Sequence, residues 1–391
     1  RKSNTSRRLY LQSIIMKEKV RYISADLLRG LVIIIMIEVH VFNAFLLPEL
    51  RQTNWFGVLN FINGLVAPSF LFVSGFAFQV SSGSKLDEMR RLGNTFWKKI
   101  ERIFQIIIIG YGLHIPFFSF SKIKNELTPE LIESFFAVDV LQCIGFGLLF
   151  LFLTRLLIRS DNKYHYFLIT SIVVVAIISP FLWKIDFTNY IPLVIANYFN
   201  RMHGSLFPLF PWVNFLLAGA VFAKYFVDAR EKNVEEKFIK LSAITGFIIL
   251  IFGHLFLSGL TPRAITSILP NPIFYLQRLG YIFILFYLCW WIDNKYNVKK
   301  SFVLDASRES LLVYWLHLII IFGAFWGGKS LALLIGNSLT VLEASLVTIV
   351  LIVFMIVAAK FWGWVKNKYP NYASLFEKVA VIVLVVVFVI S

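Results

Sequence analysis

Two ionisable residues stand at a regular spacing inside the first long apolar run of the chain, "LRGLVIIIMIEVH" at residues 28–40. Arg29 and His40 are eleven residues apart, which in an α-helix places them on one face and about 16 Å apart along the axis. An imidazole suits general-base or nucleophilic catalysis near neutral pH, and a guanidinium binds phosphate through its fork of donors. Because ionisable residues inside a membrane usually line a cavity or a reaction path, this stripe is a candidate site.

Polar side chains also enter two later apolar runs from the side opposite Arg29. Asp139 and Gln142 form an i,i+3 pair in "AVDVLQCIG", and Gln277 and Arg278 are neighbours in "YLQRLG". An acid and a base at one depth are a plausible chemical pair, so we expect these residues to lie near the substrate.

A third run, "SRESLLVYWLH", carries Ser310, Tyr314 and His317 at helical spacing on one face. These three residues lead from the cytosolic end of their apolar run into its outer half, as Arg29 and His40 do in theirs. Two such helices suggest a channel through a membrane. Four histidines fall at a similar depth in their runs and predict an outward-facing polar pocket: His40, His114, His254 and His317.

The elements that position these residues are membrane spans. The chain has 391 residues, is 58% hydrophobic and 15% charged, and has a mean hydropathy of +0.75, which a water-soluble domain of this length could not accommodate in its core. Apolar runs long enough to cross a bilayer as helix occur at 24–46, 57–80, 102–120, 135–158, 165–183, 205–227, 238–260, 272–292, 303–326 and 340–362, with a shorter one at 377–390. The sequence therefore predicts an all-α, polytopic transmembrane helix bundle of ten or eleven spans.

The distribution of charge predicts the topology. The excess of 38 Lys and Arg over 22 Asp and Glu follows alternate loops, so it indicates membrane orientation and not nucleic-acid binding. The basic N-terminal segment, residues 1–22, is then cytosolic, and residues 23–391 form one membrane domain. We expect the poorly basic loops to face outward: 47–56, 120–134, 184–204, 261–271 and 327–339.

Five stretches, in order along residues 24–320, resemble the membrane acyltransferase superfamily. "LRGLVIIIMIEVH" is similar to the arginine-x10-histidine signature of the acyltransferase 3 family. Four others resemble heparan-alpha-glucosaminide N-acetyltransferase-like proteins: "APSFLFVSGFAF", "VLQCIGFG", "FPLFPWVNFLLAGAVFAK" and "SRESLLVYWLH". In those proteins the catalytic histidine precedes a Trp-x-Gly element, whereas "RQTNWFG" keeps Trp55 and Gly57 but has Gln52 at that place. The resemblance then assigns the role to His40.

What the resemblance implies is a transmembrane O- or N-acetyltransferase that takes acetyl-CoA from the cytosol and acylates a saccharide hydroxyl or amine on the outer side. On this hypothesis residues 23–391 are the acyltransferase-like domain. We expect catalytic roles for His40, Asp139 and His317, acetyl-CoA binding by Arg29, Arg102, Arg308 and Ser310, acceptor binding by Gln142, Gln277, Arg278 and Tyr314, and no metal.

The alternative from another class is a proton-coupled secondary transporter of a small polar or sugar-like solute, since intramembrane Asp, Glu, His and Arg also build proton relays. Against it, the sequence has no repeated halves and no pair of runs that predicts broken helices. Either function places the chain in the cell (inner) membrane as a multi-pass protein in contact with the lipid bilayer, and homo-oligomerisation stays open.

Overall fold

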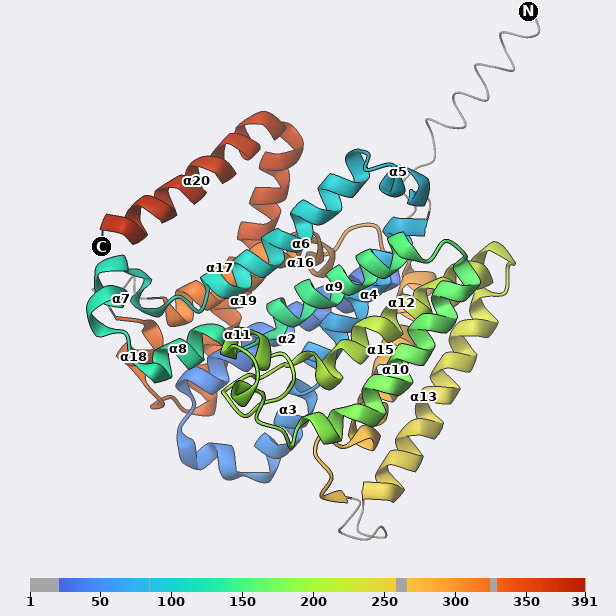
Figure 1. Ribbon diagram of the computed structural model, residues 1–391, viewed down its shortest axis with the longest axis horizontal. Helices are drawn as coiled ribbons and strands as arrows, with labels where there is room; N and C mark the ends of the chain where they lie inside the picture. The colour runs from blue at the N-terminus through green and yellow to red at the C-terminus, as the bar shows by residue number, and fades with distance from the viewer. Residues whose placement is uncertain (1–20, 84, 258–265, 324–328, 391) are drawn as a thin grey trace, which may run out of the picture.

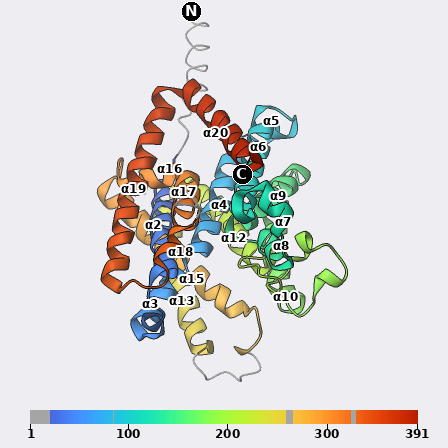
Figure 2. The same cartoon turned by 90° about the vertical axis from the view of Figure 1, so that its left-hand side faces the viewer.

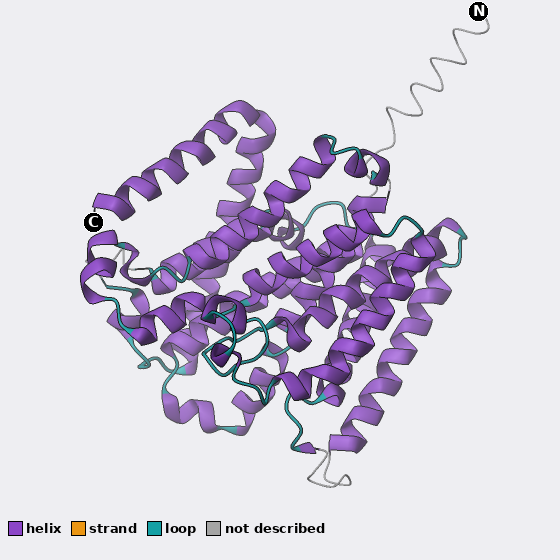
Figure 3. Ribbon diagram, viewed as in Figure 1, coloured by secondary structure: helices purple, strands orange, loops and turns teal. Residues whose placement is uncertain are grey.

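Helices make up the regular structure of the chain. The computed structural model describes residues 21–83, 85–257, 266–323 and 329–390. In these ranges every secondary-structure element longer than a single bridge is a helix (Figure 3). An isolated β-bridge joins Leu46 to Leu339. The predicted all-α fold is confirmed for the described residues.

Within the described ranges, eight helical stretches are long and apolar enough to cross a membrane. They are α3 with α4 (Asn54–Asn63 and Val66–Gly83), α9 (Val140–Leu157), α10 (Asp161–Leu182), α12 (Leu209–Glu231), α13 (Glu235–Leu257), α15 (Pro272–Tyr296), α19 (Val341–Lys368) and α20 (Pro370–Ile390). Three more helices coincide with predicted spans: α2 (Ile23–Phe45), α6 (Asn94–Gly112) and the short α17 (Ser310–Phe322). The count of ten or eleven spans stays a prediction.

The run at 303–326 is not the continuous helix that its hydropathy predicts. It is divided at Glu309 into α16 (Phe302–Arg308) and α17, and residues 324–326 lie outside the described residues. Glu309 leaves helical geometry at φ −106° and ψ 31°, and its carboxylate bonds the ammonium of Lys366 on α19 at 2.5 Å. A tertiary ion pair thus accompanies a break that hydropathy alone could not indicate.

Local sequence signals set where several helices begin. Asp139, Ser160 and Asn271 stand at the N-caps of α9, α10 and α15, where each side chain accepts a hydrogen bond from a backbone N–H. Thr340 and Glu343 form a reciprocal capping box at the start of α19. Asp139 therefore has a structural task as well as a place in the candidate site.

Helix α2 lies in the interior of the bundle and contacts α4, α15, α16, α17 and α19 (Figure 1). Gly30 lets α16 approach closely, because a Cβ at that position would lie 2.0 Å from the carbonyl oxygen of Val303. Gly75 and Gly219 do the same for α4 and α12: their Cβ atoms would meet the carbonyl oxygens of Leu216 and Phe72 within 2 Å. Backbone-to-backbone packing thus fixes the helices that carry the candidate residues.

Short helices and turns occupy the two ends of the bundle (Figures 1 and 2). The first end has α5 (Leu86–Arg90) and the turn between α19 and α20; we call it the predicted cytosolic end. The other, the predicted outer end, has the following elements: η1 (Pro48–Gln52), α3, η2 (Pro116–Phe118), α7 (Phe120–Glu126), α8 (Pro129–Phe136), η3 (Phe187–Asn189), α11 (Leu193–Ala196) and α18 (Leu331–Ile335).

The final helix leaves its neighbour and reaches the predicted outer end. Helices α19 and α20 diverge from their shared turn, and the ring of Phe388 contacts Phe118 and Phe120 beside α7 (Figure 2). Most of α20 is exposed in the structure, as expected for a helix that faces lipid.

Candidate functional site

A pair of histidines joins α2 to α17. The ring nitrogen Nε2 of His317 lies 3.0 Å from Nδ1 of His40, and the ring centroids are 5.0 Å apart. His317 is fully buried, whereas His40 is half-buried. The structure thus brings together the two histidines that the sequence placed on separate stripes.

Backbone carbonyls determine which nitrogen of each ring carries the proton. Nδ1 of His317 lies 2.6 Å from the carbonyl oxygen of Val313, and Nδ1 of His40 lies 2.9 Å from that of Met36. A carbonyl oxygen only accepts, so both Nδ1 atoms donate, and the one N–H of His40 Nδ1 is shared between the Met36 carbonyl and Nε2 of neutral His317. Nε2 of His40 is then unprotonated, and it has no hydrogen-bond partner among the described residues.

Asp139 supplies the negative charge of the site. Its Oδ1 accepts the backbone N–H of Val140 at 2.7 Å, and its Oδ2 lies 3.7 Å from Nε2 of His114. Its charge also acts on His40, Tyr314 and Cys143. A carboxylate in this position can stabilise a positive charge that develops on His40.

Two further polar side chains predicted for the site are buried around it. Tyr314 is 2% exposed, and its ring contacts His317 at 6.1 Å and Phe70 at 6.3 Å. Gln142 is fully buried, and neither atom of its amide has a hydrogen-bond partner. An unpaired buried amide is costly, which is typical of a group reserved for a ligand.

The arginines predicted to bind the donor lie near the predicted cytosolic end. Asp26 pairs with both Arg29, at 3.6 Å, and Arg21. The charge of Arg102 acts on Arg29, and Glu309 in turn acts on Arg102. Two arginines share one carboxylate and a third arginine lies nearby, so this region carries a net positive charge.

Arg308 and Ser310 flank the break between α16 and α17. Arg308 is exposed and lies 3.5 Å from Asp305, so it is neither buried nor free of an ion pair. The close approach at Gly30 brings α16 against α2, but no hydrogen bond or ion pair joins Arg308 or Ser310 to Arg29 in the described ranges.

Gln277 and Arg278 form a separate group on α15. Gln277 packs against Gly253 of α13, while Nε of Arg278 donates to the carbonyl oxygen of Gly64 at 3.1 Å. Among the described residues neither side chain bonds the histidine pair. Tyr275, one turn before Arg278, connects the two groups: both it and Asp139 interact electrostatically with Cys143.

His40 and His114 both interact with Asp139, and His317 joins them through its contact with His40. His254, on α13, instead lies 3.5 Å from the hydroxyl of Tyr281. The outward-facing polar pocket predicted from the four histidines stays a prediction, and His254 contacts none of the other three within the described residues. Glu38, on the α2 face away from Arg29, accepts a hydrogen bond from Asn63 at 3.4 Å.

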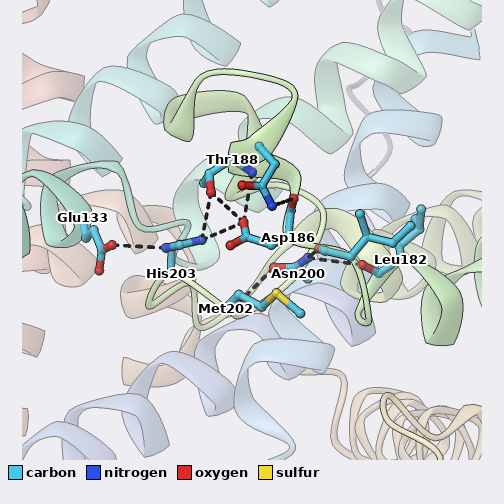
Figure 4. Close-up of polar contacts among 9 residues, drawn as sticks. Glu133, Leu182, Asp186, Thr188, Asn200, Met202 and His203 are labelled. Carbon is cyan, nitrogen blue, oxygen red and sulfur yellow. Dashed lines mark hydrogen bonds and ion pairs between the residues drawn. The ribbon is translucent and has the colours of Figure 1, made fainter.

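An outer network that the sequence did not predict surrounds His203 (Figure 4). Its Nδ1 lies 3.1 Å from Glu133 of α8, and its Nε2 lies 3.0 Å from Asp186, which also bonds Thr188. The hydrogen bonds from His203 to the two carboxylates raise its pKa, and those from Thr188 and His203 lower the pKa of Asp186 to about 2. This network ties the segment before α12 to α8.

These observations define a class: a multi-pass helical membrane protein with a histidine pair and a carboxylate in its interior, groups that suit proton or acyl transfer. Residues 21–257 match the family described as heparan-alpha-glucosaminide N-acetyltransferase, catalytic. Because the match covers more than half of the 391 residues, the chain belongs to this family of transmembrane acetyltransferases. A search among curated proteins finds no match to the chain.

The family match divides the candidate residues. Arg29, His40 and Asp139 lie within residues 21–257, whereas Arg278 and His317 lie beyond them. The contacts in the structure connect the matched part to α15, through Arg278 and Gly64, and to α17, through the histidine pair.

Proposed function

We propose that the chain transfers an acetyl group from cytosolic acetyl-CoA to a sugar hydroxyl or amine on the outer side of the cell (inner) membrane. The observation that carries the proposal is the geometry of the histidine pair and its two backbone carbonyls, from which we infer that the lone pair of His40 Nε2 is free. That lone pair is what a general base or an acyl-accepting nucleophile requires. Asp139 nearby favours the imidazolium that forms when His40 takes a proton.

The positive region around Arg29 fits the donor. Arginine forks recognise phosphate oxygens, and Arg29, Arg102 and Arg308 lie on helices α2, α6 and α16. Ser310 begins α17, the helix that also carries His317. Acetyl-CoA would supply a thioester, and these residues would hold its nucleotide near the cytosol while the arm follows the stripe toward His40.

Two routes share these residues. In the first, Nε2 of His40 takes the proton of the acceptor hydroxyl or amine while the acceptor oxygen or nitrogen attacks the thioester carbonyl; the thiolate leaves and receives that proton from His40. In the second, Nε2 attacks that carbonyl itself and the thiolate leaves; the acceptor then attacks the acetyl carbon, Nε2 leaves, and the acceptor's proton passes to the thiolate. In both routes the amide of Gln142 or the hydroxyl of Tyr314 would donate to the developing oxyanion.

His317 is a positioning residue in this proposal, because it acts through His40. As hydrogen-bond acceptor it fixes the ring orientation of His40 and reinforces the tautomer that the carbonyl of Met36 favours; in metal sites the loss of a comparable second-layer contact typically costs 10- to 100-fold in activity. The arginine-x10-histidine arrangement of α2 supports an acyltransferase 3-like mechanism within the acetyltransferase family.

The test is transfer by the purified protein in liposomes with radiolabelled acetyl-CoA outside and candidate amino sugars and sugars inside. We expect labelled acetyl to leave CoA and to appear on a lumenal sugar when the protein's cytosolic end faces outward. Rapid denaturation in detergent at neutral pH, without acceptor, distinguishes the two routes. Label that stays on the wild-type protein and is absent from His40→Ala indicates the second route.

A conservative series tests the role of His317. Gln at this position keeps an acceptor near the place of Nε2, so His317→Gln should retain more activity than His317→Leu, and both should bind acetyl-CoA normally. Uptake of sugar without loss of acetyl from CoA would contradict the proposal and would favour a transporter. Equal activity of both variants would remove His317 from the mechanism.

A further inference from the structure

Arg278 and Arg155 are the two buried arginines of the described ranges, and Arg278 is the one that has no carboxylate partner. Arg155, 2% exposed, pairs with Asp161, and Arg29 pairs with Asp26. Arg278 is 8% exposed, yet within the described ranges it forms no ion pair. The undescribed ranges contain a single acidic residue, Glu18, in the predicted cytosolic segment, so no acid of the outer loops remains to pair with it.

The surroundings of the guanidinium satisfy it only in part. Nε donates to the carbonyl oxygen of Gly64, one face of the group lies 3.3 Å from the centre of the Phe274 ring, and Nη1 is buried without a partner. A neighbouring ring offsets little of the cost of desolvating a cation, and an unpaired buried charge is strongly unfavourable. Such a group is a candidate binding site for an anion.

A second unpartnered donor lies beside the same tyrosine. The indole Nε1 of Trp212 on α12 is buried without a partner, and its ring contacts Tyr275 at 5.7 Å. The charges of Arg278 and Arg201 both act on Tyr275. Guanidinium and indole can only donate, so the ligand that satisfies both is rich in acceptors and negatively charged.

The location of this cluster indicates which substrate bears the anion. Arg278 is six residues into α15, about 9 Å from its start at the predicted outer end. Tyr275 connects it to Asp139 through Cys143. The donor arginines lie at the opposite end, so an anion bound here belongs to the molecule that arrives from outside.

We propose that Arg278 and Trp212 bind an oxyanion, such as a carboxylate, on the sugar that accepts the acetyl group. This inference rests on the proposed function and narrows its acceptor to an acidic saccharide. The anion would orient the acceptor through the charge-assisted bond to Nη1 and the bond to the indole N–H.

The experiment measures binding without acetyl-CoA, so that its outcome is independent of whether transfer occurs. The purified protein in phosphatidylcholine nanodiscs is titrated calorimetrically with glucuronate, with glucose and with sodium sulfate. A charge-assisted hydrogen bond should make glucuronate bind on the order of 10-fold or more tighter than glucose. The preference should vanish in Arg278→Gln and remain in part in Arg278→Lys.

Two more variants complete the test: a second perturbation of Arg278 and a matched control. Gly64→Ala retains the charge but introduces a Cβ that would lie 2.9 Å from Nη2 of Arg278, so it should reduce the preference even if Arg278→Gln fails to fold. Lys184→Gln removes an exposed cation from the predicted outer side and is the matched control, in which the preference should be unchanged.

Four results would overturn the inference. They are an unchanged preference in Arg278→Gln, no detectable binding of glucuronate to the wild type at millimolar concentrations, sulfate binding as tightly as glucuronate, and loss of the preference when phosphatidylglycerol is added to the nanodisc. The third result assigns the site to a free anion and the fourth to a lipid headgroup. Failure of acetyl transfer with intact glucuronate preference would overturn the proposed function alone.

Discussion

Replacement of His40 by alanine separates a catalytic histidine from one that merely joins two helices. His40→Ala removes the only imidazole nitrogen of the pair that is free to accept a proton. Loss of a general base typically slows a reaction by about 10²–10⁴-fold. At 1.36 kcal/mol per decade, this raises the barrier by roughly 2.7–5.4 kcal/mol.

The expected effect on stability is smaller. The variant loses the 3.0 Å bond between His40 Nδ1 and His317 Nε2 and the local bond to Met36. Hydrogen bonds between membrane helices contribute on average about 0.6 kcal/mol and at most about 2 kcal/mol. Since His40 is half-buried, its removal leaves little enclosed volume, and the protein should fold and insert.

Both quantities are measured on one preparation: acetyl transfer in liposomes and the melting temperature in detergent, with the affinity for acetyl-CoA as a third reading. His254→Ala is the matched control, because His254 lies at a similar depth but contacts Tyr281 instead of the histidine pair. We expect the control to keep its turnover within a factor of a few.

Turnover close to wild type in a folded His40→Ala protein would refute the reasoning from the proton arrangement. A large loss of turnover together with a loss of acetyl-CoA affinity would also contradict it, because His40 should act on the reacting groups and not on the nucleotide. A parallel loss in His254→Ala would point to general disruption of the bundle.

Other parts of the structure give predictions of their own. Arg29→Ala should weaken acetyl-CoA binding about 10-fold with turnover at saturation nearly unchanged, and Arg29→Lys should recover part of the affinity; equilibrium binding with unchanged affinity would reject the phosphate role. The raised pKa of His203 means that its ion pairs stabilise the fold fully below its ordinary pKa of 6.5 and are lost as pH rises through the raised value, so the melting temperatures of wild type and His203→Gln should differ more at pH 6 than at pH 9. Gly75→Val should destabilise the protein by about 1–3 kcal/mol or more, because its Cβ would overlap the carbonyl oxygen of Leu216, whereas Gly83→Ala, with nothing within 4 Å of the added atom, should be nearly neutral in the same unfolding assay.

The sequence predicted those features that depend on local spacing. Hydropathy placed the long apolar helices but not the break between α16 and α17, and the eleven-residue spacing put Arg29 and His40 on one face of α2. The spacing of Tyr314 and His317 likewise predicted their contact on α17. Helical periodicity is a property of the chain itself, so it can be read before any tertiary contact is known.

Contacts between helices could not be derived in this way. Nothing in the spacing of residues indicates that His317 meets His40, that His114 lies beside Asp139, or that His254 turns toward Tyr281. These depend on how α2, α6, α13 and α17 are rotated about their axes, and therefore on packing between residues far apart in the sequence, such as that of Gly30 against Val303.

Two arginines show how the presence or absence of an ion-pair partner distinguishes a structural residue from a candidate binding residue. Arg155 and Arg278 both stand near apolar runs, and from sequence either could be a binding residue or a structural one. The structure gives Arg155 a carboxylate, Asp161, and the ring of Tyr164, which together satisfy much of its charge. Arg278 has a ring and one carbonyl but no carboxylate within the described ranges. Because a buried charge that lacks a counter-charge is retained only at a cost, Arg278 is the arginine that we propose binds an anion from outside the chain.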